Sequence, residues 1–230
     1  MSASPLKLIV FDVDGTLIDS QAHIIGAMQQ AFAECDIAAP ARSEILACVG
    51  LSLDIGMLRL APQASLAERE QLVTAYKDAF ANMRRSLGAQ AAPFYPGAYE
   101  TLMRLAHWPG VVLGVATGKS KRGLDGIIEA HALEGMFVTR QVADFHPSKP
   151  HPAMLLAALD ETGVSAQDAV MIGDTSFDMD MARDAGTGAI GVSWGYHSAA
   201  SLTSADLIVD DFAALESALA QPWPLLGVKT

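Results

Sequence analysis

Cysteine and basic residues are scarce in this sequence of 230 residues. The two cysteines, Cys35 and Cys48, lie thirteen residues apart and form no CxxC motif, so the sequence has neither a disulfide framework nor a cysteine-based metal motif. Lysine and arginine number 15 against 26 acidic residues, a formal net charge of −11. Such a charge opposes binding to the phosphate backbone of nucleic acids. We therefore expect reduced thiols, a cytoplasmic location and no nucleic-acid partner.

Long apolar runs are also absent. Although 51% of the residues are hydrophobic, no stretch approaches the roughly 20 apolar residues that a membrane-spanning helix needs. The residues Met1 to Pro5 are small and polar, and the apolar run after them is short, so we expect no secretory signal and no membrane partner. A chain of this length buries roughly 70% of its unfolded surface, in one or two domains.

One stretch, Lys7 to Leu17, carries two carboxylates at the end of an apolar run. Its first part is rich in β-branched residues and predicts a parallel strand that is buried on both faces, ending at Gly15. In a regular strand the side chains of Asp12 and Asp14 would point the same way. Their mutual repulsion would be relieved by a cation, by a phosphoryl group that one of them attacks, or by a shared proton.

The remaining pattern changes once along the chain. Between Asp19 and Ala92 only helical periodicity is found, whereas strands alternate with helices after Gly97. Asp19 and Ser20 are expected to cap the first of these helices, with a direct role at an active site as the alternative. Alternation after Gly97 predicts an α/β fold with a doubly wound, mostly parallel Rossmann-like sheet. We expect an α/β core over residues 1–17 and 94–230, an inserted all-helical cap over residues 18–93, and an irregular tail from Gln221 to Thr230. The expected strands after the first are Val111–Val115, Phe137–Thr139, Ala169–Ile172, Ala189–Val192 and Leu207–Val209.

Chemically useful side chains follow several of these strands. Open α/β sheets bind their ligands at the carboxyl ends of the strands. Thr117 and Gly118 follow the second strand, and Asp174 follows the strand Ala169–Ile172 with Asp178 four residues later. Lys149 precedes Pro150 near the start of a helix, where an anion is welcome. Together these residues offer carboxylates for a hard cation, and a hydroxyl and an ammonium group for phosphoryl oxygens.

Four short motifs, in this order along the chain, resemble those of the haloacid dehalogenase superfamily. They are Asp12-Val13-Asp14-Gly15-Thr16, Thr117 at the end of an apolar strand, Lys149-Pro150-His151-Pro152, and Gly173-Asp174-Thr175-Ser176-Phe177-Asp178. The helical insert after the first motif is similar to the cap of the phosphoglycolate phosphatase branch. The resemblance implies a magnesium-dependent phosphatase that hydrolyses a small phosphate monoester, phosphoglycolate-like, through an aspartyl-phosphate intermediate.

Roles for the matching residues also come from this resemblance. Asp12 would be the nucleophile, and Asp14 would protonate the leaving oxygen and then activate water. Thr117 and Lys149 would bind the phosphoryl oxygens. The cap would open and close about hinges near Ile18 to Ser20 and Ala92 to Gly97.

The implied metal site uses oxygen ligands, which favour Mg²⁺ over zinc. Asp12, Asp174 and the backbone carbonyl of Asp14 would hold the ion. Asp178 would act through water or orient Lys149, and Gly118 would lie beside the substrate.

Alternative functions follow from the same residues. A β-phosphoglucomutase-like phosphomutase is one, and a phosphoacceptor signalling module is another, from a different class. The order of motifs opposes the second, because a receiver domain carries its acceptor aspartate on a middle strand and its Lys-Pro pair last. An acid at Asp14 opposes a dehalogenase, since halide leaves without a proton. The sequence leaves open the natural substrate and the choice between monomer and homodimer.

Some further matches carry no function. Gly118-Lys119-Ser120 resembles the end of a P-loop, but the required first glycine would fall at Leu113. His146 and His151 flank the lysine motif, and scattered loop histidines of this kind are usually polar surface residues. Arg59, Arg84 and Arg85 lie in the helical insert, and a solvated surface is the expected place of Arg84 and Arg85; as the alternative, one of the three arginines would gate a carboxylate of the substrate.

Overall fold

The computed structural model describes residues 5–87 and 92–221, and the tail predicted to be irregular lies almost entirely outside them. Six parallel strands form one sheet in the order β3-β2-β1-β4-β5-β6. The strands are β1 (Lys7–Phe11), β2 (Val111–Thr117), β3 (Thr139–Val142), β4 (Ala169–Gly173), β5 (Gly188–Val192) and β6 (Leu207–Val209). The predicted doubly wound α/β fold is confirmed.

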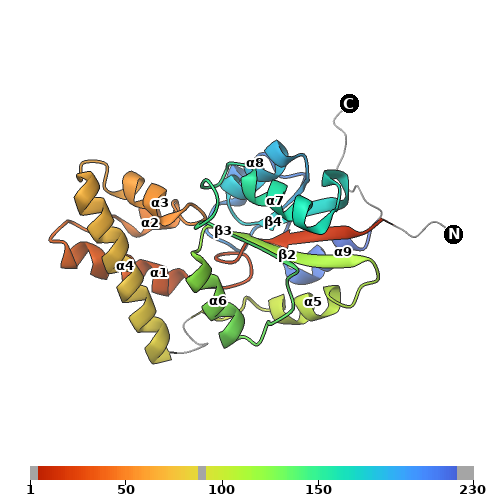
Figure 1. The fold of residues 1–230 in the computed structure, drawn as a ribbon, viewed down its shortest axis with the longest axis horizontal. Coiled ribbons are helices and arrows are strands. Elements are labelled where there is room, and N and C mark those ends of the chain that lie inside the picture. The colour runs from red at the N-terminus through yellow and green to blue at the C-terminus, as the bar shows by residue number, and fades with distance from the viewer. Residues whose placement is uncertain (1–4, 88–91, 222–230) are drawn as a thin grey trace.

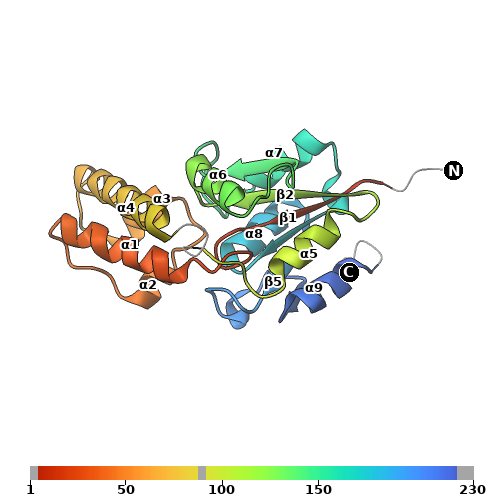
Figure 2. The same cartoon turned by 90° about the horizontal axis from the view of Figure 1, so that it is seen from below.

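Helices cover both faces of this sheet, as Figure 2 shows from below. On one face Ile9 and Phe11 pack with residues of three helices, and on the other Leu8 and Val10 pack with residues of two. This burial on both sides explains why β1 reads as a continuous apolar run. The first face is covered by α5 (Ala98–Leu105), α6 (Lys121–Ala130) and α9 (Phe212–Leu219), the second by α7 (Ala153–Thr162) and α8 (Ser176–Ala185).

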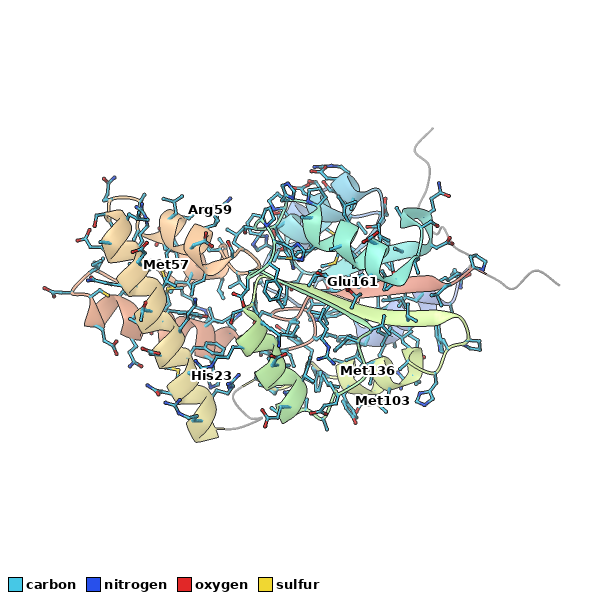
Figure 3. All side chains as sticks on the ribbon, viewed as in Figure 1. His23, Met57, Arg59, Met103, Met136 and Glu161 are labelled. Carbon is cyan, nitrogen blue, oxygen red and sulfur yellow. The ribbon has the colours of Figure 1, made fainter. Side chains whose placement is uncertain are left out.

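A separate group of four helices lies beside the sheet, at the left of Figure 1. It has its own apolar cluster, in which Phe32, Met57 and Leu72 are fully buried or nearly so. Figure 3 places Met57 and Arg59 in this group and Glu161 beside the sheet. Its helices are α1 (Gln21–Glu34), α2 (Arg42–Leu46), α3 (Leu53–Leu60) and α4 (Leu66–Leu87).

Two chain segments connect this group to the sheet, and they pair with each other. Ile18 and Phe94 form an isolated antiparallel bridge. The amide of Asp19 donates to the carbonyl oxygen of Pro93 at 2.8 Å, and the amide of Tyr95 donates to that of Leu17 at 3.0 Å. The entry and exit of the helical group therefore lie side by side.

The third strand was predicted in the wrong place. The expected segment Phe137–Thr139 overlaps the observed β3 at Thr139 alone. Thr139 and Gln141 are polar yet buried, because their side chains bond to Glu161 Oε2 at 2.5 and 2.8 Å. An apolar pattern therefore could not mark this strand, whereas Phe137 reaches the core from the preceding turn.

The cap of the first helix also differs from expectation. Ser20 is the residue before α1 but makes no capping bond with its side chain, while Asp19 accepts from the amide of Gln21 at 3.3 Å. The α2 helix begins with a bond from the amide of Ala41 to Glu44 Oε2 at 2.7 Å. The Ser20 hydroxyl is thus available for another partner.

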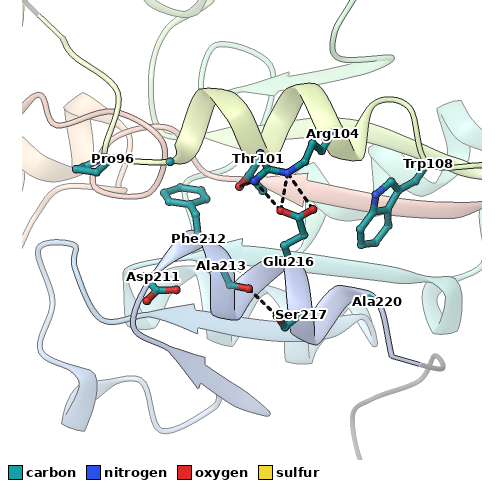
Figure 4. Close-up of a pocket in the computed structure, with 11 residues that line it drawn as sticks. Pro96, Thr101, Arg104, Trp108, Asp211, Phe212, Ala213, Glu216, Ser217 and Ala220 are labelled. Carbon is teal, nitrogen blue, oxygen red and sulfur yellow. Dashed lines mark hydrogen bonds and ion pairs between the residues drawn. The ribbon is translucent and has the colours of Figure 1, made fainter.

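One surface groove lies away from the carboxyl ends of the strands. A groove of about 610 Å³ runs between α5 and α9, where Arg104 Nε donates to Glu216 Oε2 at 2.8 Å (Figure 4). Exposed ion pairs of this kind contribute little stability.

In the two described ranges, no helix has both the length and the apolar character needed to cross a bilayer.

We expect Leu102→Ala to lower the free energy of unfolding by about 2–5 kcal/mol, because Leu102 is fully buried between α5 and the sheet. Urea unfolding at 25 °C measures this change. Met103→Ala is the matched control. Met103 is the next residue on α5 and is 36% exposed, so this substitution should lower the free energy of unfolding far less. Equal losses in the two variants would contradict the assigned core.

Candidate active site

Three strands bring their ends to one edge of the sheet. Phe11 on β1 is in register with Val115 on β2 and with Ile172 on β4. Asp12 and Asp174 directly follow β1 and β4, and Thr117 is the last residue of β2, so the three residues are neighbours at this edge. All three are buried, with at most 1% of their surface exposed. The predicted meeting of these side chains at the carboxyl edge is observed.

A buried lysine joins two of the carboxylates. Lys149 Nζ lies 2.9 Å from Asp12 Oδ1 and donates to Asp178 Oδ1 at 2.6 Å. Asp178 is held in turn at the start of α8, where its Oδ2 accepts from the Thr175 amide at 3.0 Å and from the Thr175 hydroxyl at 2.7 Å. This reciprocal capping box fixes the orientation of Asp178. Asp178 thus positions Lys149 next to Asp12, one of the two roles expected for it.

Asp174 is held from the opposite direction. Its Oδ1 accepts from the Thr16 hydroxyl at 2.9 Å and its Oδ2 from the Tyr196 amide at 2.8 Å. Gly15 packs against this carboxylate with φ of +85°, and a Cβ there would lie 2.2 Å from Asp174 Oδ2. Only glycine fits, because both the backbone conformation and the space exclude a side chain.

Negative charge exceeds positive charge in this buried cluster. Desolvation raises the pKa of Asp12 from 3.8 to about 7, Lys149 opposes the rise, and Asp178 and Asp14 add to it. Desolvation and the charges of Asp12 and Asp178 raise the pKa of Asp174 well above its ordinary value. Burial alone would lower the pKa of Lys149, but Asp12 and Asp178 outweigh it and raise that pKa. One ammonium group cannot neutralise three carboxylates.

The cluster fits a hard cation. Carboxylate oxygens of Asp12, Asp174 and Asp178 all lie within 4.8 Å of one another. Asp12 Oδ2 is buried and has no hydrogen-bond partner among the residues that the structure describes. A buried oxygen of this kind is costly unless something satisfies it, and oxygen ligands suit Mg²⁺. Of the expected ligands, Asp12 and Asp174 belong to this group, Asp178 joins them, and the side chain of Asp14 points to other partners.

Asp14 is held by residues that sequence reasoning did not select. Lys119 Nζ donates to both of its carboxylate oxygens, at 2.8 and 2.7 Å. The Ser20 hydroxyl also donates to Asp14. Tyr196 Oη accepts from the Ser20 amide at 3.1 Å and lies 3.2 Å from the Ser20 hydroxyl oxygen. The only sequence signal for Lys119 was its place two residues after Thr117. Ser20 had been assigned to capping, and nothing marked Tyr196.

A cleft of about 600 Å³ opens above these groups, between the sheet and the helical group. Asp12, Asp14, Thr117 and Lys119 line its sheet side. Gly118 also lines it and packs directly under the loop before α3, so that a Cβ there would lie 2.5 Å from the carbonyl oxygen of Gly50. These residues of the sheet side therefore share one cavity with the helical group.

The histidines beside the lysine motif have structural partners. His146 Nε2 bonds with Gln141 Oε1 at 2.7 Å, and His151 Nδ1 accepts from the amide of Ala153 at 3.2 Å, at the start of α7. Arg59 in the helical group lies over the ring of Phe177, 5.2 Å from its centroid. None of these three contacts involves the clustered carboxylates.

A carboxylate cluster with a buried lysine at the carboxyl edge of a parallel sheet suits phosphoryl transfer. Residues 9–192 match the model of the haloacid dehalogenase-like hydrolase family. The probable phosphatase IndB of Dickeya dadantii is 35% identical over 92% of each chain. A phosphoglycolate phosphatase of Vibrio parahaemolyticus is 28% identical over 94% of this chain and 96% of the other.

A solved structure has the same fold. It is that of a predicted phosphoglycolate phosphatase from Haemophilus somnus, 24% identical, with a TM-score of 0.82 over 96% of this chain and all of the other. The chain belongs to the haloacid dehalogenase-like hydrolases. The expected class of enzyme, a phosphoric monoester hydrolase, is confirmed.

The raised pKa of Asp12 gives a testable pH dependence. Because its folded pKa is about 7, Asp12 contributes stability that is fully present below about pH 4 and lost as the pH rises through about 7. We expect Asp12→Asn to increase the free energy of unfolding in EDTA at pH 8 by more than about 1 kcal/mol, with a smaller gain at pH 5. Lys149 keeps Asp178 as its partner in this variant.

Urea unfolding at several pH values measures the effect. Asp160→Asn, at an exposed position of α7, is the matched control and should show no such pH dependence. A gain that is the same at pH 5 and pH 8 would contradict the raised pKa of Asp12.

Proposed function

We propose that the enzyme is a magnesium-dependent phosphatase that hydrolyses a small phosphate monoester through a phosphorylated Asp12. The observation that carries this proposal is the state of Asp12, which is buried, paired with Lys149 and still has one oxygen without a partner in the described part of the chain. Asp12 also lines the cleft beside Asp14. A carboxylate with a free oxygen that faces a cavity is placed to attack.

In the first step an Asp12 oxygen forms a bond to phosphorus as the bond from phosphorus to the ester oxygen breaks. Asp14 gives a proton to the leaving oxygen. Lys149, beside Asp12, interacts with the oxygens of the transferred group. The Thr117 oxygen accepts from the amide of Lys119 at 3.2 Å, so its own proton is available for a phosphoryl oxygen.

In the second step Asp14 takes a proton from water, which attacks the phosphorus and frees Asp12 and inorganic phosphate. Lys119 and Ser20 hold Asp14 in one orientation between the two steps. Both roles of Asp14 depend on the same carboxylate facing the cleft, and these contacts fix it there.

Asp12, Asp174 and Asp178 would hold Mg²⁺, with the backbone carbonyl of Asp14 as the further ligand we expect. When bound, the ion supplies positive charge against the carboxylates and the phosphoryl oxygens. The substrate would be a small phosphorylated metabolite, and several relatives carry the name phosphoglycolate phosphatase. We also propose a cytoplasmic location, no nucleic-acid or membrane partner, and a monomer or homodimer.

Phosphate release from a panel of small esters, in Mg²⁺ and in EDTA, tests the proposal. We expect release in Mg²⁺ alone, and a loss of at least about 10³-fold in Asp12→Asn because the nucleophile is removed. Asp160→Asn is the control. Release from Asp12→Asn near the wild-type rate would contradict the assigned nucleophile. A long-lived phosphorylated Asp12 without turnover would favour the phosphoacceptor, and isomerisation of a sugar phosphate would favour the mutase.

We further propose that residues 18–93 act as a cap that opens and closes about the paired segments near Ile18 and Phe94. In support, the helical group contacts the sheet part through short bonds near the cleft. The amide of Ser52 donates to the hydroxyl of Ser148 at 2.8 Å, and Gly118 lies under Gly50 and Leu51. Loops of this kind exclude water and position the substrate.

We expect Gly118→Ala to keep the cap from closing fully, because its Cβ would lie 2.5 and 2.6 Å from the carbonyl oxygens of Gly50 and Leu51. The expected result is a fall in kcat/KM of at least about tenfold and a larger radius of gyration in small-angle scattering with a phosphate analogue and Mg²⁺. Gly56→Ala is the control, since a Cβ there meets nothing within 4 Å. Wild-type kinetics in Gly118→Ala would contradict the cap contact.

A further inference from the structure

The cap side of the cleft is apolar. Its wall combines buried residues of the cap cluster with partly buried residues on α4. Among the apolar residues that line it are Ile24, Met28, Ile45, Val49, Val73, Tyr76 and Phe80. Residues of the cap core therefore line the same cavity as Asp12 and Asp14.

Two aromatic residues of this wall lie near the acid that would release the product alcohol. The Tyr76 and Phe80 rings are 5.8 Å apart, and Lys119 Nζ lies 5.0 Å from the Phe80 centroid. The same Nζ bonds both oxygens of Asp14. Burial, and secondly the charge of Asp14, raise the pKa of Tyr76, which agrees with this proximity. The aromatic pair therefore lies beside Lys119, the residue that holds Asp14, on the wall of the same cleft.

Basic side chains at the cleft have other partners or lie at its rim. Lys119 is paired with Asp14, and Arg84 Nη1 donates to the carbonyl oxygen of Arg122 at 3.4 Å. Lys77 and the side chain of Arg122 are exposed. A carboxylate placed against Tyr76 and Phe80 would be buried among apolar side chains, which is unfavourable.

We propose that the cleft selects a phosphate monoester whose alcohol part carries an aromatic ring or a comparable apolar group, and that Tyr76 and Phe80 are its specificity-determining residues. This inference rests on the proposed phosphatase function and narrows its substrate class. A cavity of about 600 Å³ is within the range of ordinary ligand pockets and far exceeds a two-carbon phosphate. Ring stacking on Tyr76 and Phe80 adds to the burial of apolar surface.

A matched series of esters tests this inference with the wild-type enzyme and Mg²⁺. The esters are ethyl phosphate, n-butyl phosphate and 2-phenylethyl phosphate, with phosphoglycolate as the carboxylated comparison. We expect kcat/KM to rise about 10- to 100-fold from ethyl to 2-phenylethyl phosphate, the gain for burying an aromatic side chain. Phosphoglycolate should fall below 2-phenylethyl phosphate.

The outcomes separate the two proposals. If phosphate is released but kcat/KM is the same for all four esters, or is highest for phosphoglycolate, the apolar substrate class is overturned and the proposed phosphatase function stands. Absence of metal-dependent release from every ester would overturn both. The series needs no variant, so a folding defect cannot obscure the result.

Variants locate the selectivity on α4. In Tyr76→Ser and Phe80→Ser the ratio of kcat/KM for 2-phenylethyl over ethyl phosphate should fall by about 3- to 10-fold. The ratio is the readout, because a change in Asp14 or in folding alters both esters alike. Leu66→Ser is the matched control on the same helix, since Leu66 is 67% exposed and does not line the cleft. An unchanged ratio in both aromatic variants would overturn their role.

Discussion

The excess of buried negative charge around Lys149 is the constraint on which the rest of the site depends. Lys149, Asp12 and Asp178 are almost completely buried and form ion pairs, and Asp174 adds a third buried acid. Such a group is stable only when other charges and dipoles compensate it. The capping box of α8 and the Thr16 hydroxyl supply part of this compensation, and the free oxygen of Asp12 leaves the remainder to a cation and a phosphoryl group.

A second group of residues works around Asp14, and it joins the two parts of the molecule. Ser20 comes from the entry to the cap, Lys119 from the loop after β2, and Tyr196 from the loop after β5. Asp14 is therefore held both by the segment that enters the helical group and by loops at the carboxyl edge of the sheet. Phe80 of the helical group lies 5.0 Å from Lys119 Nζ, so the helical group is also part of the surroundings of Asp14.

Several elements could be predicted because their residues carry the reason for them. The apolar run of β1 is buried on both faces, and the periodicity of α4 matches its packing on the cap cluster. β3 could not be placed, because Thr139 and Gln141 are buried through bonds to Glu161 on α7, a partner some twenty residues away. The position of Ser20 before a helix predicts a cap, whereas its hydroxyl bonds to Asp14 and lies beside the hydroxyl of Tyr196, contacts that the tertiary structure brings about.

By itself the sequence determined the order of strands and helices, the acids at the ends of β1 and β4, and the lysine before Pro150. Local periodicity and the carboxyl-end rule require only neighbouring residues. Only the tertiary structure decided that Asp178 holds Lys149, that Lys119 holds Asp14, and that the helical group presents an apolar wall to the cleft beside Asp14. These contacts join residues from 29 to 105 positions apart, and no local pattern specifies which of the distant side chains will meet.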